Sequence, residues 1–202
     1  MYGTRTNGRR RSLARRARSG AADWPDDVQR LRKLLGSKDG IRRQHARMAL
    51  VRRGESVVSL FVDLLLDGTK RERWEAAKAL TTIGDSTAAP ALVAALMDDD
   101  EEIRWLAAEG LIALGTGAVV PLMEGLERNF DSVYLLQGTH HVLHALEREH
   151  KLSPSVQGVL DELRSLEPDD RLPWAARAAL LEIMNNQRPA VSSQSRRSVR
   201  RS

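Results

Sequence analysis

The sequence predicts an all-α protein, an α-solenoid of about five stacked helix pairs. The first observation behind this prediction is a seven-residue motif that begins with Trp and ends with Leu, present at 74–80, 105–111 and 174–180. Small residues follow each Trp and lie with the Leu on one helical stripe, which allows a neighbouring helix to approach closely. The second observation is the regular spacing of these motifs, which is typical of helical repeat arrays.

Leucines anchor the repeat at Leu50, Leu80 and Leu111, which are separated by 30 and 31 residues. Four positions after each anchor the chain has a glycine: Gly54, Gly84 and Gly115. Glycine adopts the left-handed conformation without a side-chain clash, and helices often end in that conformation. We therefore expect each of these glycines to terminate the first helix of a pair.

A second apolar segment follows each glycine, at 57–66, 88–97 and 119–126. Pro90 and Pro121 lie near the starts of two of these segments, where a missing amide hydrogen costs least. The repeat unit is thus predicted to be a helix, a glycine turn, a second helix and a loop.

The array is predicted to extend in both directions from these full repeats. Toward the C-terminus, 131–150 is a degenerate first helix, Pro154 starts the next helix, and Leu180 anchors a last copy of the motif. At the other end, 28–35 is a short amphipathic helix ended by Gly36, which we expect to cap the array.

Residues 23–186 are therefore predicted to form the repeat array, with Arg-rich, disordered tails at 1–22 and 187–202. The 202 residues are 42% hydrophobic and include no cysteine, so a continuous aliphatic core is possible and disulfides are excluded. The chain has neither the roughly 20-residue apolar run of a membrane-spanning helix nor the apolar core of a secretory signal. We expect a cytoplasmic protein with no membrane span.

Charge divides the chain into regions of opposite sign. The net charge is +5, yet residues 1–20 carry +7 and residues 188–202 carry +5, which leaves −7 for residues 21–187. Within that stretch residues 21–55 carry +4, so residues 56–187 carry −11. A phosphate backbone would be repelled by most of this surface, so nucleic acid is expected to bind only through the tails, if at all.

Residues 73–85, followed by 88–92 and the loop 97–104, resemble the HEAT-like repeat of the phycobilisome-lyase, or E-Z, type. The resemblance implies an α-solenoid built from HEAT-like repeats. It implies less about function, because the same repeat serves bilin lyases, the iron enzyme deoxyhypusine hydroxylase and many non-catalytic adaptors.

A histidine cluster is the one group with a catalytic appearance, and it comprises His140, His141 and His144. Imidazoles at this helical spacing can bind zinc, copper or iron. No other repeat supplies a facing ligand, and the His-Glu pairs that hold iron in deoxyhypusine hydroxylase do not occur in this sequence. We therefore predict no metal site, no cofactor and no catalytic residue.

Trp74, Trp105 and Trp174 occupy the same place in three repeats. A catalytic pocket needs differentiated residues, so this identity favours a repeated packing role. We expect the three indoles to be wedges between repeats.

The function predicted from these features is that of a non-catalytic scaffold that binds another protein through its acidic surface. Second helices conventionally line the inner face of such arrays, and here their non-core positions are small or acidic. The predicted protein-binding residues are Asp63, Asp98, Asp99, Asp100, Glu101, Glu102 and Glu124. Their charge favours a basic or amphipathic partner. A phycobilin-lyase-like or metal-dependent enzyme subunit, and a nucleic-acid-associated protein acting through its tails, remain the alternatives.

Overall fold

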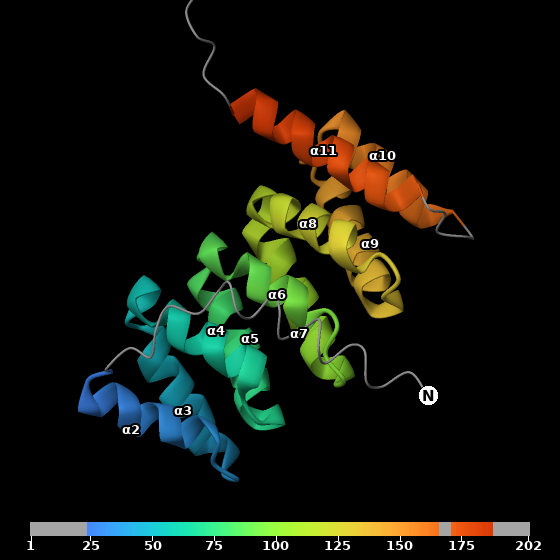
Figure 1. Cartoon of the computed structure of the whole chain (residues 1–202). Coiled ribbons are helices and arrows are strands. Elements are labelled where there is room, and N and C mark those ends of the chain that lie inside the picture. The colour runs from blue at the N-terminus through green and yellow to red at the C-terminus, as the bar shows by residue number, and fades with distance from the viewer. Residues whose placement is uncertain (1–23, 166–170, 188–202) are drawn as a thin grey trace, which may run out of the picture.

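The computed structural model describes residues 24–165 and 171–187, and this part of the chain is helical, with no strands (Figure 1). The predictions made for the two Arg-rich tails lie outside the described residues. Helices stack in chain order from one end of the molecule to the other, which confirms the predicted α-solenoid (Figure 1).

Each repeat begins with a long helix, here termed a first helix. The first helices are α3 (Gly40–Val51), α5 (Lys70–Ile83), α7 (Glu101–Leu114) and α9 (Val133–Arg148). The second helices are α4 (Val58–Asp67), α6 (Ala89–Ala95), α8 (Val119–Asn129) and α10 (Pro154–Arg164). The described chain begins with α2 (Asp26–Leu35) and ends with α11 (Arg171–Gln187).

The three predicted glycine turns all occur at positive φ. Gly54, Gly84 and Gly115 have φ of 61°, 71° and 60°, a region in which a side chain would be strained. Short 3₁₀ turns then lead into the second helices. Gly84 and Gly115 end α5 and α7 as predicted, whereas α3 ends at Val51, three residues before Gly54. The order of first helix, glycine turn and second helix is confirmed for three consecutive helix pairs.

The helices pack in two layers. First helices α3, α5, α7 and α9 contact one another in order, and second helices α4, α6 and α8 do the same. This order changes at the C-terminal end, because α11 packs against α8 and α10. The motif at 174–180 thus continues the second-helix layer, although its sequence is that of a first helix.

Second helices α4, α6 and α8 are mostly buried, so the expectation that they expose small residues to a partner is wrong. Ala94, Ala95 and Gly125 are all buried. A Cβ atom built on Gly125 would lie 2.7 Å from Cγ1 of Val93, so this glycine permits the close packing of α8 on α6. The small residues serve the core of the array.

One stretch of the described chain, Glu101–Asn129, is long and apolar enough by composition to span a membrane. It consists of α7 and α8, joined at Gly115, and 56% of its most apolar window is buried within the protein. Burial of this kind is the property of a core segment and is compatible with a soluble protein.

Candidate protein-interaction site

The three repeated tryptophans do not share one environment. Trp74 is partly buried against the core and has the ammonium of Lys78 4.4 Å from its ring centroid. Trp105 and Trp174 are 58% and 71% exposed, so they do not act as wedges between repeats. The prediction failed because the small residues that follow each Trp face the neighbouring helix, and this leaves the indole at the solvent edge.

The predicted acidic run 98–102 divides into buried and exposed residues. Asp98 is fully buried and accepts two hydrogen bonds of 2.9 Å from Nε and Nη2 of Arg73. The backbone N–H of Asp100 also donates to its carboxylate, at 3.0 Å. Asp98 is therefore an internal ion-pair partner of α5, and its assignment to a partner-binding surface is wrong.

Asp100 is the N-cap of α7. Its Oδ1 accepts a hydrogen bond of 3.1 Å from the backbone N–H of Glu102, and its other oxygen pairs with the ammonium of Lys70. The hydrogen bond from Lys70 lowers the pKa of Asp100, and the same contact raises the pKa of Lys70. Asp100 thus stabilises the start of the helix and links it to α5.

The remaining members of the run, Asp99, Glu101 and Glu102, are exposed. None of them forms an ion pair within 24–165 or 171–187. Trp105 follows Glu101 and Glu102 by four and three residues on α7, so it projects from the same side of the helix. We call these four residues the acidic edge.

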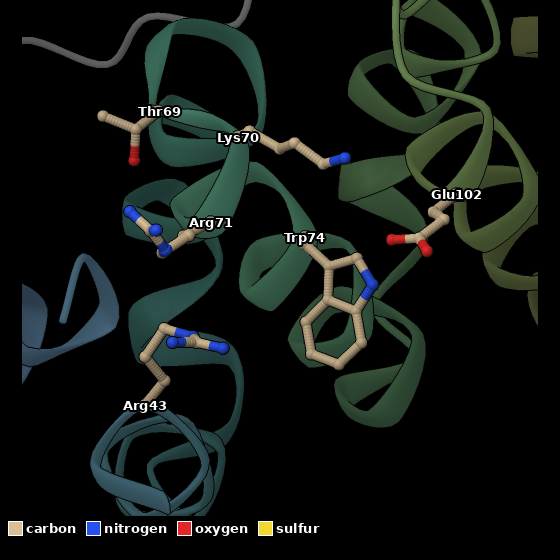
Figure 2. A pocket seen from close by; sticks show the side chains of 6 residues that line it. All are labelled: Arg43, Thr69, Lys70, Arg71, Trp74 and Glu102. Carbon is tan, nitrogen blue, oxygen red and sulfur yellow. The ribbon is translucent and has the colours of Figure 1, made fainter. Parts of the chain in front are cut away.

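A pocket of about 530 Å³ adjoins the acidic edge between the starts of α5 and α7. It is lined by Arg43, Thr69, Lys70, Arg71, Trp74 and Glu102. Figure 2 shows Trp74 in the middle, with Arg43 and Arg71 on one side and the carboxylate of Glu102 on the other. The indole therefore supplies an apolar surface between groups of opposite charge.

Two cations of the pocket are already neutralised by carboxylates. Lys70 pairs with Asp100, and Nε of Arg43 donates to Oε1 of Glu75 at 3.1 Å. Arg71 is exposed and forms no ion pair with the described residues. The charges left to meet a ligand are thus Arg71 on one wall and Glu102 on the other.

Glu75 is a buried charge that the sequence analysis missed. It is 1% exposed, and its Oε2 lies 3.0 Å from Nε of Arg47, in addition to its bond with Arg43. Pairing with two arginines of α3 compensates for the loss of hydration. A sign of this role was present in the sequence, because Glu75 occupies the position that Leu106 fills in the next repeat.

Arginines recur one position before Trp74 and Trp105, and they connect successive repeats. Arg73 reaches forward from α5 to Asp98, as described above. Arg104 donates to the backbone oxygen of Asp98 at 2.8 Å and stacks on Tyr134, with its guanidinium carbon 4.1 Å from the ring centroid. These contacts hold the loop before α7 in a fixed conformation beneath the acidic edge.

The other two predicted binding residues lie on second helices. Asp63 is half-buried on α4, and Glu124 is half-buried on α8, where it pairs with Arg128 at 2.5 Å. The structure therefore places them in a different layer from the acidic edge. They do not join it in one surface.

The histidines of α9 do not converge on a common point. The rings of His140 and His144 stack with centroids 6.1 Å apart, whereas Nε2 of His141 lies 3.6 Å from Oε1 of Glu109 on α7. Burial, and then the neighbouring His144, lowers the pKa of His140. Within the described residues no group of three potential metal ligands is present.

Stacked helix pairs with glycine turns define this chain as a helical repeat protein. Residues 58–135, from α4 to the start of α9, match the family model described as HEAT repeats. The match supports a HEAT-like repeat protein, in agreement with the sequence pattern. No curated protein matches the chain.

Proposed function

We propose that this protein is a non-catalytic scaffold that binds an amphipathic segment of another protein at the acidic edge and the adjoining Trp74 pocket. HEAT repeats are commonly protein-interaction scaffolds. The observation that carries the proposal is the division of the acidic run. Asp98 and Asp100 are used within the fold, whereas Asp99, Glu101 and Glu102 are exposed and form no ion pair in the described part of the chain.

The chemistry of this surface favours a partner that carries both apolar and basic side chains. Trp74 offers an apolar floor, and a pocket of about 530 Å³ is large enough for an apolar side chain of the partner. Lysine or arginine residues of the same segment would meet Glu101, Glu102 and the exposed ring of Trp105, which attracts cations. Arg71 lies on the opposite wall and disfavours a purely cationic ligand in the pocket.

The contacts beneath the surface support this assignment. Because Arg73, Arg104 and Asp98 fix the loop, the backbone that bears the exposed carboxylates is held in place before a partner arrives, which reduces the entropy cost of association. The repeated use of arginine at this position ties the edge to three successive first helices. The surface is therefore part of the rigid array.

The test is affinity capture with a triple variant, Asp99→Ser, Glu101→Ser and Glu102→Ser. We expect the triple variant to lose the proteins that the wild type retains at low salt. The variant Trp74→Ala should lose the same proteins, although it leaves the surface charge unchanged. The matched control is Asp26→Ser, Glu55→Ser and Asp131→Ser, which removes three exposed acids elsewhere. Equal capture by the two triple variants would contradict the proposal.

The finer predictions from the sequence stay predictions. They include the phycobilisome-lyase type of the repeat, the cytoplasmic location and the alternative role of the tails in nucleic-acid binding. An enzyme of the lyase-like or metal-dependent kind would carry a coloured adduct or a stoichiometric metal. An absorption spectrum and an elemental analysis of the purified protein test this alternative.

A further inference from the structure

The two ends of the array differ in the helix face that they present to solvent. The exposed positions of α2 at the N-terminal end are mostly charged or polar, as expected for a terminal helix, and include Gln29, Arg30, Arg32 and Lys33. At the opposite end, α11 exposes Trp174, Leu181 and Met184, at 71%, 54% and 57%. Ala178 lies between them and is also exposed.

This apolar stripe lies opposite the face that α11 buries. Leu172, Ala176 and Ala179 are buried where α11 packs on α8 and α10. Trp174, Ala178 and Leu181 are separated by four and three residues and therefore share one side of the helix. Exposed Arg177 and Asn185 border these side chains on the same helix. Large apolar side chains that are exposed together and rimmed by polar residues mark an interaction surface.

We propose that this stripe, defined as Trp174, Ala178, Leu181 and Met184, is the interface of a two-fold homodimer in which two α11 helices pack antiparallel. The alternation of a large, a small and a large side chain is self-complementary. With the two-fold axis beside Ala178, Trp174 of one copy lies beside Leu181 of the second copy, and the two small Ala178 side chains let the helices approach closely.

Charge complementarity favours the antiparallel arrangement. Arg171, at the start of α11, is 70% exposed and lies 4.0 Å from Glu162 of its own copy. In the antiparallel arrangement it also comes within one helical turn of Glu182 in the second copy, and the symmetry repeats this pair. The arginine tails give a second reason, because residues 188–202 carry +5 and follow directly on α11. Antiparallel packing separates the two tail origins by about 25 Å, the length of a 17-residue helix. That distance exceeds the Debye length of about 8 Å at physiological salt.

The C-terminal tail lacks the large apolar side chains needed to cover the stripe. Among residues 188–202 the apolar side chains are Ala190, Val191 and Val199, which are small beside an indole, a leucine and a methionine.

The absence of cysteine from the sequence allows a direct test of the two-fold axis. Ala178→Cys places one thiol of each copy beside the axis, close enough for a disulfide after mild oxidation. We expect a covalent dimer from this variant. The matched control is Ile41→Cys, whose exposed thiol lies away from the proposed interface and should give little cross-linked product.

Light scattering of the full chain after size exclusion is expected to give about twice the monomer mass of 22.5 kDa. Trp174→Glu and Leu181→Glu, both at exposed positions, should each raise the dissociation constant at least about tenfold. The single variants Arg171→Glu and Glu182→Arg should weaken the dimer, and combining them should restore it.

A monomeric wild type, a dimer unaffected by Trp174→Glu and Leu181→Glu, or equal cross-linking of the two cysteine variants would each overturn the homodimer. Circular dichroism of every variant shows whether its helix content is unchanged, which separates loss of the dimer from loss of the fold. This interface is distinct from the acidic edge, so the dimer and the scaffold function can fail independently.

Discussion

In the second-helix layer, α6 exposes one of its seven residues, Pro90, whereas α7 in the first-helix layer exposes Glu101, Glu102 and Trp105. The two helices are neighbours in one repeat and both are rich in alanine and leucine. Helix α6 is enclosed because α4, α7 and α8 all pack against it, while no further layer of the described chain covers the outer side of α7. Position in the stack thus decides whether a helix is enclosed or faces solvent.

The largest difference between enclosed and exposed positions is expected at the two phenylalanines of the chain, which lie in one second helix and at the end of another. Phe61, on α4, is fully buried, and Phe61→Ala should lower the free energy of unfolding by about 3–5 kcal/mol, because it leaves a large cavity. Phe130 follows α8 and is 43% exposed, so Phe130→Ala should cost much less. Urea denaturation of both variants measures the contrast. Similar losses would contradict the burial difference.

The next contrast lies within the acidic run. Asp98→Ala removes the carboxylate that Arg73 needs, and we expect a loss of about 3 kcal/mol because a largely buried guanidinium is left without its partner. Asp99→Ala, one residue on, should change stability by no more than about 0.5 kcal/mol. Thermal denaturation of the two variants side by side tests this. A loss of stability for Asp99→Ala as large as that for Asp98→Ala would contradict the division of the acidic run.

Two glycines on second helices give a third contrast between an enclosed and an exposed position. Gly125→Ala introduces a methyl group 2.7 Å from Cγ1 of Val93, and this overpacking should cost about 1–3 kcal/mol. Gly158→Ala on α10 meets no atom within 4 Å, so the gain in helix propensity should stabilise the protein by up to about 1 kcal/mol. Guanidinium denaturation measures the free energy of unfolding of both variants, which should fall for Gly125→Ala and rise for Gly158→Ala.

The smallest effect is expected at the outer layer itself. Trp105→Ala should alter the free energy of unfolding by no more than about 0.5 kcal/mol, because the indole is mostly exposed. Trp74→Ala should cost about 1–2 kcal/mol, since its ring is partly buried against the core. Differential scanning calorimetry separates the two. A larger loss for Trp105→Ala would mean that the first helices depend on this tryptophan for packing.

Much of the fold could be predicted from local sequence signals. Gly84 and Gly115, four positions after their leucine anchors, end α5 and α7, because a helix ends where the backbone takes a positive φ. The helical spacing of apolar residues and the residue types that form turns depend only on residues close in the sequence. The candidate site was harder to predict from the sequence, because nothing in it distinguishes Asp98 from Asp99 until the position of Arg73 is known.

The sequence by itself determined that this protein is a stack of helix pairs with glycine turns, and that its middle is acidic between two Arg-rich tails. Only the tertiary structure decided which side of each helix is covered. Burial is set by neighbours far along the chain, so it separated Asp98 from Glu101, enclosed Gly125, and left Trp105 and Trp174 in solvent. It also moved α11 into the second-helix layer, where packing on α8 and α10 leaves its apolar stripe exposed.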